Sequence, residues 1–259
     1  MTKLTQRNYF TTKNQYLSNS KLKDYAKDKH YFYQKHVLGN IEQKKTDALF
    51  IGSAVDCWLT SGEKKFREKY YIVSRRTTNS PDYEFQLNQT MYDSVEKMCR
   101  KIESQTAYTQ LRGFKAQQIL QVDRKIGIFE GLCGIPDWFK VKDDHCIIVD
   151  LKTAENALQT KYHYKCLEYG YYQQQAMYRI LVQANYPEVK IFEHRHLVVE
   201  KDPDGINNVF VYKLSEARVL EEVDEIEKLL LEIAEEKKFL PRNVSWDDVI
   251  TIGEINEDF

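Results

Sequence analysis

Residues 134–153 have the sequence GIPDWFKVKDDHCIIVDLKT, and this stretch constrains the fold more than any other part of the chain. A polar run at 142–145 is flanked by segments rich in Trp, Phe, Ile and Val, a pattern that predicts a β-hairpin. If the chain turns symmetrically about the middle of that run, Asp137 and Asp150 face each other across the two strands. Directly opposed residues have Cβ atoms about 4.5–5.5 Å apart, which is close enough for both carboxylates to hold one metal ion.

Lys152 follows Asp150 by two positions and therefore projects from the same face of its strand. Two opposed carboxylates on apolar strands are costly unless a cation neutralises them. Divalent cations held by carboxylates serve phosphodiester hydrolysis, so the residues indicate a metal-dependent phosphodiesterase site. Its expected metal ligands are Asp137, Asp150 and the backbone carbonyl of Leu151, and Lys152 is expected to orient the water or stabilise charge. A surface hairpin that carries only an Asp150–Lys152 ion pair is the alternative.

The composition is that of an ordinary globular protein, with 42% hydrophobic and 30% charged residues and a net charge of −1. This charge gives no support to general nucleic-acid affinity, although a local basic groove is compatible with it. The five cysteines are scattered and form no Cys-x-x-Cys pair, which predicts free thiols in a reducing cytosol. Lysines concentrate in the first 45 residues and form either a basic binding surface or a solvated helix face: Lys21, Lys23, Lys27, Lys29, Lys35, Lys44 and Lys45.

The order of expected elements predicts an α/β or α+β fold around a central mixed sheet flanked by helices. Helices are expected at 18–37, 47–60, 161–184 and 215–238, and 61–115 is expected to be mostly helical with a loop near 77–81. Strands are expected at 117–123, 126–133, 136–141 and 146–151, and a second hairpin pairs 191–200 with 207–213 across a turn at 202–205. No repeat, low-complexity tract or flexible linker divides the chain, so we expect one domain. The N-terminus lacks an apolar leader and no run approaches the ~18 residues of a membrane span.

Several of these motifs together resemble the PD-(D/E)XK nuclease superfamily. The signature is Gly134-Ile135-Pro136-Asp137 followed by a hairpin and Asp150-Leu151-Lys152-Thr153. Gln174 and Tyr178, which share one helical face, resemble the Gln-x-x-x-Tyr motif of RecB-like and RecE-like nucleases. Tyr171 is a weaker candidate for the same motif. By this resemblance, Gln174 and Tyr178 would contact the DNA phosphate or orient the catalytic lysine, and the alternative is a polar pair that buttresses the sheet.

Two further segments narrow the resemblance. Residues 50–56, FIGSAVD, resemble the helix in which those families carry Gly-(Thr/Ser)-Ala-(Leu/Val)-His, but this chain has Asp56 in place of the metal-binding histidine. Aspartate is a competent ligand for magnesium or manganese, so Asp56 is a further candidate ligand, with a cap or salt bridge as the alternative. Residues 197–212 resemble the strand pair that follows the core in RecE-type phage exonucleases. The resemblance covers about 16–60 and 117–240, whereas 61–115 resembles nothing that we can name.

The resemblance implies a restriction-endonuclease-like core at about 116–240, preceded by a helical part at about 1–115 and followed by a short C-terminal tail, all in one exonuclease domain (1–259). It implies a Mg²⁺- or Mn²⁺-dependent exonuclease that digests DNA from duplex ends, 5′ to 3′, in phage-type recombination. It also implies a ring of three or four subunits, a single-strand annealing protein as partner, and the cytoplasm of a bacterial or phage-infected cell as location, with no membrane partner.

Two other functions remain open at this stage. A structure-specific endonuclease would cut closed circular DNA, and a non-catalytic DNA-end-binding protein would bind without cutting. Opposed carboxylates on apolar strands argue against the second, because they destabilise a scaffold that has no use for them. His194 and His196 alternate on one strand face, where partly exposed histidines are more common than metal ligands. Glu130, on the preceding strand, is not expected to belong to the site.

Overall fold

The computed structural model describes residues 3–5, 9, 15–42, 46–77, 80–202 and 206–236. Its centre is a five-stranded mixed sheet with the strand order β10-β9-β8-β7-β4. Strands β8 and β9 are parallel to each other, and every other neighbouring pair in this sheet is antiparallel. The strands are β4 (Lys115–Ala116), β7 (Trp138–Lys142), β8 (His145–Ala154), β9 (Ile191–Glu200) and β10 (Val209–Lys213).

Two smaller sheets accompany the central one. The first has the order β1-β6-β5, with β1 (Tyr16–Leu17) parallel to β6 (Phe129–Gly134) and β6 antiparallel to β5 (Leu120–Ile126). The second pairs β2 (Tyr71–Ile72) with β3 (Gln86–Leu87).

The predicted hairpin is present with its expected register. Trp138 pairs with Val149, and Lys142 pairs with His145 around a turn in which Asp143 has a positive φ of 53°. Asp137 and Asp150 are the next two residues beyond the Trp138–Val149 pair. They therefore lie at the end of the β7–β8 ladder, although β8 itself continues to Ala154 beside β9.

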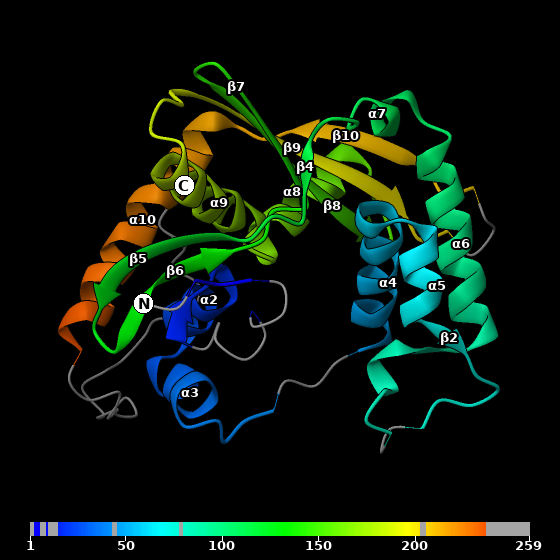
Figure 1. Cartoon of the computed structure of the whole chain (residues 1–259), viewed down its shortest axis with the longest axis horizontal. Helices are drawn as coiled ribbons and strands as arrows, with labels where there is room; N and C mark the ends of the chain where they lie inside the picture. Colours follow the sequence, from blue (N-terminus) through cyan, green and yellow to red (C-terminus); the bar gives the residue numbers. More distant parts are fainter. Residues whose placement is uncertain are drawn as a thin grey trace, which may run out of the picture.

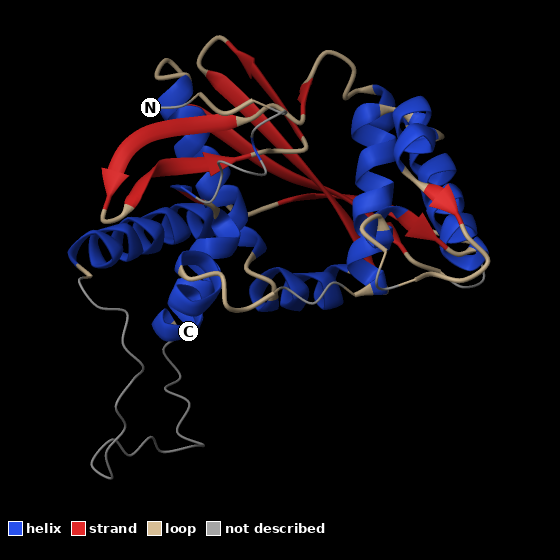
Figure 2. Ribbon diagram, turned by 60° about the horizontal axis from the view of Figure 1, so that its bottom comes forward, coloured by secondary structure: helices blue, strands red, loops and turns tan. Residues whose placement is uncertain are grey.

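Helices gather on both sides of the central strands (Figure 1). On one side lie α4 (Asp47–Ser61), α5 (Glu63–Lys69), η3 (Tyr83–Phe85), α6 (Gln89–Glu103) and α7 (Thr106–Thr109). On the other lie α2 (Asn19–Lys27), α3 (Lys29–Phe32), the π-helical turn η2 (Tyr33–Val37), α8 (Gln159–Glu168), α9 (Tyr171–Asn185) and α10 (Glu216–Glu235). Figure 2 shows the same separation, with the strands running between the two groups.

The two groups of helices cover two hydrophobic clusters that share the central sheet. Cys146 and Ile148 of β8 pack with α9 and α10, whereas Val149 and Leu151 pack with α4 and α6. This alternation follows from the two-residue period of a strand, and it explains why β8 is apolar on both faces from Cys146 to Val149. Asp150 is the exception, because it is an acidic residue that is only 1% exposed.

Three expected elements differ from the structure. The helix predicted at 161–184 is wrong as a single element, because Gly170 has a left-handed φ of 59° and separates α8 from α9. The helix predicted at 18–37 is interrupted at Asp28, whose extended backbone ends α2 and whose side chain accepts a 2.7 Å hydrogen bond from Tyr31 N at the start of α3. The strand predicted at 117–123 begins only at Leu120, because Gln117 is left-handed with φ 49°.

The remaining expected elements are present. The predicted amphipathic helix at 215–238 is α10, and residues 191–200 and 209–213 form the predicted antiparallel pair. The turn expected between them, at 202–205, lies mostly outside the described residues, as does the C-terminal tail. All five cysteines are free thiols, as predicted. None of the described helices is long and apolar enough to cross a membrane.

Candidate active site

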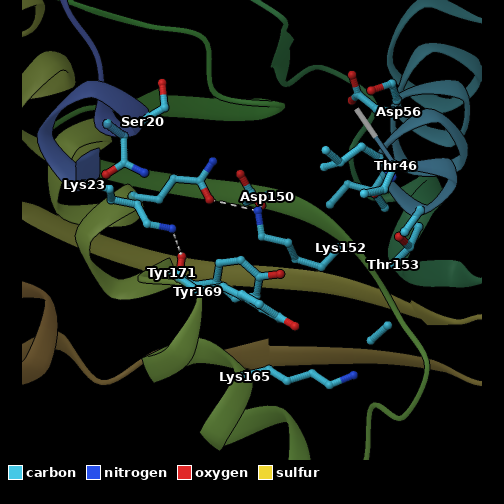
Figure 3. A pocket seen from close by; sticks show the side chains of 18 of the residues that line it. Ser20, Lys23, Thr46, Asp56, Asp150, Lys152, Thr153, Lys165, Tyr169 and Tyr171 are labelled. Atoms are coloured by element: carbon cyan, nitrogen blue, oxygen red, sulfur yellow. Dashed lines mark hydrogen bonds and ion pairs between the residues drawn. The ribbon is translucent and has the colours of Figure 1, made fainter. Parts of the chain in front are cut away.

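The three acidic candidates line one cleft of about 820 Å³ that opens between the two groups of helices (Figure 3). Asp56 comes from α4, Asp137 from the residue before β7, and Asp150 from β8. Asp56 and Asp150 are 94 positions apart in sequence and meet here because α4 packs against β8. Asp56 thus lies on the wall formed by α4, across the cleft from Lys23 and Tyr169 (Figure 3).

Hydrogen bonds hold the first two carboxylates in place. Asp137 accepts a 2.7 Å hydrogen bond from the backbone N–H of Leu151 through Oδ2, which ties it to β8. Its Oδ1 lies 3.1 Å from Nε2 of Gln117, and the same nitrogen lies 3.1 and 3.3 Å from Oδ1 and Oδ2 of Asp56. A single amide therefore bridges Asp56 and Asp137. Asp150 pairs instead with the ammonium group of Lys152.

The pKa values of Asp137 and Asp56 are both raised. Burial, the charge of Asp150 and that of Asp56 hold the pKa of Asp137 well above its ordinary value. Burial and the charge of Asp150 likewise raise the pKa of Asp56, to about 7. Both effects have the same physical cause, since several anions in a water-poor site cannot all ionise without a compensating cation. The site therefore favours the binding of an additional positive charge.

Lys152 is the cation that the chain itself supplies. Burial acts to lower the pKa of Lys152, but the carboxylates of Asp150 and Asp137 outweigh burial and raise the pKa above its ordinary value. Its side chain is 14% exposed, and its Nζ lies 4.5 Å from the centre of the Tyr171 ring. The ring face attracts the ammonium group.

A chain of hydrogen bonds fixes the direction of Lys152. Nζ donates to Oε1 of Gln174 at 2.8 Å, and Nε2 of Gln174 donates to the hydroxyl of Tyr178 at 2.9 Å. That hydroxyl donates to the carbonyl of Ile135 at 3.1 Å. Gln174 and Tyr178 therefore connect Lys152 to the segment that carries Asp137, and their roles as orienting or DNA-contacting residues remain predictions. Gly134 in that segment has no side chain because a Cβ there would lie 2.8 Å from Leu181 Cδ1, which packs beside Tyr178.

The donor chemistry of the site fits a hard divalent cation, which prefers carboxylate, amide and carbonyl oxygens. Within the described ranges, however, no three His, Cys, Asp or Glu side chains converge closely enough to hold a metal ion by themselves. The reason is local, because the amide of Gln117 lies between Asp56 and Asp137 and Asp150 is turned toward Lys152. Binding of a cation by all three carboxylates would thus require Asp56, Asp137 and Asp150 to exchange these partners for the cation.

The opposite wall of the cleft is basic and aromatic. Lys23, Lys165 and Lys201 line it, and Lys23 donates a hydrogen bond to the carbonyl of Tyr169 (Figure 3). Burial, together with the charge of Lys152, lowers the pKa of Lys23 despite the opposing charge of Asp24. Positive groups so near the carboxylates suit a polyanion that spans the cleft. Lys23 and Lys35, two of the N-terminal lysines for which a basic surface and a solvated helix face were both open, belong to the lining.

The structure also tests what the sequence suggested for His194, His196 and Glu130. His194 and His196 were expected to be partly exposed, and this is wrong, because they are 1% and 0% exposed. His196 bonds to the Tyr162 hydroxyl at 2.8 Å and His194 to Gln175 at 3.2 Å, since α8 and α9 cover this face of β9. Glu130 pairs with Lys125 and does not line the cleft. The backbone carbonyl of Leu151 remains a predicted ligand.

Gln117 contacts two of the three acidic candidates but was not predicted to belong to the site. It was assigned to the first position of the strand expected at 117–123. No local signal identifies it, because its position depends on the pairing of β4 with β7 through Lys115 and Phe139.

Comparison with known proteins gives a family and a fold. Residues 18–240 match the model of a family described as "PDDEXK-like domain of unknown function (DUF3799)". A crystal structure from Eubacterium rectale, described as a "Putative exonuclease", superposes with a TM-score of 0.65 over 95% of this chain and 97% of that chain, at 16% identity. The crystal structure of SSO0001 covers 81% of this chain and 84% of its own at 13% identity, and its TM-score of 0.28 is too low to support an argument. Curated proteins gave no match.

Proposed function

The chain belongs to the PDDEXK-like domain family, within the PD-(D/E)XK nuclease superfamily, and from this premise we propose that it is a Mg²⁺- or Mn²⁺-dependent DNA exonuclease. The observation that supports the proposal best is the buried pair of Asp150 and Lys152 beside Asp137 and Asp56, at the floor of a cleft with a lysine-lined wall. A bound divalent cation would supply an activated water and relieve charge on the phosphate.

The protein's own groups have separate roles in this proposal. Asp137, Asp150 and Asp56 hold the cation, with the Leu151 carbonyl as a further ligand. Lys152 is held protonated by the neighbouring carboxylates, so it stabilises negative charge on the phosphate and orients water rather than acting as a base. Gln174 and Tyr178 keep Lys152 at its position through the hydrogen bonds described above.

Attack on duplex ends in the 5′ to 3′ direction, in phage-type recombination, is the finer part of the proposal. It is supported by the motif resemblance and by the exonuclease description given to the E. rectale protein. The test is digestion of linear and closed circular duplex DNA, with separate labels at the 5′ and 3′ ends, in magnesium, manganese or EDTA. Metal-dependent loss of linear DNA alone, with early release of the 5′ label, supports it. Cutting of circles would favour an endonuclease, and end binding without cleavage would favour a binding protein.

Lys152→Ala should abolish cleavage while leaving DNA binding within a few-fold of the wild type, because one ammonium group is lost at the reacting phosphate while the rest of the basic wall remains. Lys140→Ala is the matched control, since Lys140 is an exposed lysine on β7 that does not line the cleft. Cleavage rates and DNA dissociation constants of the two variants are measured side by side. Digestion by Lys152→Ala at the wild-type rate would show that the site is assigned wrongly.

A further inference from the structure

Both the backbone and the side chain of Gln117 form hydrogen bonds with the acidic residues of the site. Its φ of 49° lies in the left-handed region that residues with a side chain rarely adopt. Its backbone N–H donates a 3.0 Å hydrogen bond to the carbonyl of Asp137, and its side-chain nitrogen contacts Asp56 and Asp137. Such backbone conformations persist only where the surroundings enforce them, and they cluster at functional sites.

The amide nitrogen borders the gap in which a cation shared by Asp56 and Asp137 would lie. It lies 3.1, 3.3 and 3.1 Å from three oxygens that belong to two carboxylates. A neutral N–H group carries only a partial positive charge, so it offsets only part of the repulsion between two neighbouring carboxylates. A divalent cation in the same gap would offset it fully, but Asp56 and Asp137 alone provide too few oxygens for a cation that takes six or more.

The Gln117 amide also contains an oxygen, which is the kind of ligand that the cation still requires. The oxygen and nitrogen of a glutamine amide exchange places by a half-turn about χ3, a torsion with a broad and roughly two-fold energy profile. This rotation requires no movement of the backbone, so the contact from the Gln117 N–H to Asp137 would be kept. The oxygen would then face the gap between Asp56 and Asp137, where the nitrogen is now.

We propose that Gln117 is a ligand of the divalent metal site and that, without a cation, its amide group links the two carboxylates of that site. When no cation is bound, the amide nitrogen keeps Asp56 and Asp137 together, and when a cation binds between them, the rotated amide presents its oxygen as a neutral ligand. This inference rests on the proposed function in one respect, namely that a divalent cation binds at these carboxylates.

The test uses the full chain and two readouts that are independent of catalysis. The first is the dissociation constant for Mn²⁺, by titration calorimetry, and the second is the melting temperature in EDTA. Gln117→Ala should bind Mn²⁺ roughly tenfold more weakly, in line with the loss of one supporting group at a metal site, and should melt at a lower temperature in EDTA. Gln117→Glu should bind Mn²⁺ more tightly than the wild type but melt lower in EDTA, because it adds an anion to the cluster.

Gln118→Ala is the matched control, because Gln118 is the adjacent glutamine and its amide points to the hydroxyl of Tyr186 instead. It should match the wild type in Mn²⁺ affinity. Unchanged Mn²⁺ binding by Gln117→Ala would overturn the inference. Tighter Mn²⁺ binding would also overturn it, because Gln117 would then only compete with the metal. If the wild type itself binds no Mn²⁺, the metal-dependent function fails, and this outcome is distinct from failure at Gln117.

Discussion

The hydroxyl of Tyr178 joins the two halves of the site. It accepts from Gln174, which holds Lys152, and donates to the carbonyl of Ile135, two residues before Asp137. One phenol therefore sets the distance between the candidate lysine and the segment that carries a candidate ligand. A residue of this kind acts through others, and its loss should impair the reaction step more than DNA binding.

Tyr178→Phe should lower kcat roughly 10- to 100-fold, the usual range for groups that orient the residues around a metal, and leave KM for DNA nearly unchanged. The variant also leaves the Ile135 carbonyl without its donor, which costs about 1–3 kcal/mol of stability. Steady-state kinetics on linear DNA give the values of kcat and KM. Tyr172→Phe, on the same helix but outside the cleft, should retain wild-type kinetics, and equal losses in both variants would argue against the orienting role.

Asp56 makes stability depend on pH in a direction opposite to that of an ordinary salt-bridged carboxylate. Its pKa rises from 3.8 to about 7 on folding, so the folded protein binds the proton more tightly than the unfolded chain. The stabilisation is complete below pH 3.8 and is lost as the pH rises through about 7. Asp137 acts in the same direction, since its pKa is also raised.

We therefore expect the melting temperature of Asp56→Asn in EDTA to exceed that of the wild type by a margin that grows between pH 4 and about pH 7. The comparison with the variant is needed because burial lowers the pKa of His194 to about 3, and this histidine removes stability as the pH falls below its ordinary pKa of 6.5. Taking the difference between two proteins that share His194 cancels that contribution. A margin that stays constant with pH would contradict the raised pKa of Asp56.

At the scale of elements, the break between α8 and α9 depends on Gly170. Its φ of 59° is left-handed, and a Cβ would lie 3.2 Å from Cε of Lys23, whose ammonium group bonds to the Tyr169 carbonyl. The break turns the chain so that α8 borders the cleft while α9 presents Gln174 to Lys152. It also positions Tyr169 and Tyr171 on either side of the turn, with ring centres 5.8 Å apart.

Gly170→Ala should lower the free energy of unfolding by about 1–2 kcal/mol, the cost of a left-handed conformation for a residue with a Cβ, as measured by urea denaturation. Gly52→Ala tests a glycine in a regular helix, where the new Cβ would meet only Thr153 Oγ1 at 3.6 Å. That substitution should raise stability by roughly 0.5–1 kcal/mol. If Gly170→Ala lowered the free energy of unfolding no more than Gly52→Ala did, a side chain at position 170 would not strain the backbone there.

The elements that could be predicted are those whose signals are local. The hairpin register follows from a two-residue period and a polar turn, which is why Asp137 and Asp150 could be paired from the sequence. Gly170 was not recognised, because apolar residues continue at helical spacing through it. Gln117 and the burial of His194 could not be predicted, because they depend on which distant elements pack together: β4 against β7 in the first case, and α9 against β9 in the second.

At the scale of the whole molecule, the cleft exists because two hydrophobic clusters share one sheet. Helix α4, which carries the FIGSAVD segment, and α5 and α6, from the 61–115 stretch that resembled nothing familiar, pack on β8 and β9 through Val149, Leu151 and Leu197. Helix α4 supplies one wall of the cleft and Asp56. The assembly of this molecule into a ring of three or four subunits, and its pairing with an annealing protein, remain proposals, and light scattering of the purified chain would measure the first.

A shared sheet should make the two clusters unfold together, in agreement with the single domain expected from the sequence. Phe66 of α5 and Phe139 of β7 are buried in different clusters, at 1% and 0% exposure. Each change to Ala should cost about 3–5 kcal/mol and should shift the urea midpoints of tryptophan fluorescence and far-ultraviolet circular dichroism equally. Trp58 and Trp138 lie in the cluster of Phe66, so fluorescence follows that cluster, whereas circular dichroism follows all helices. If Phe66→Ala separated the two midpoints, α4 to α6 would form an independent domain, and the cleft would lie at a domain boundary rather than within one cooperative unit.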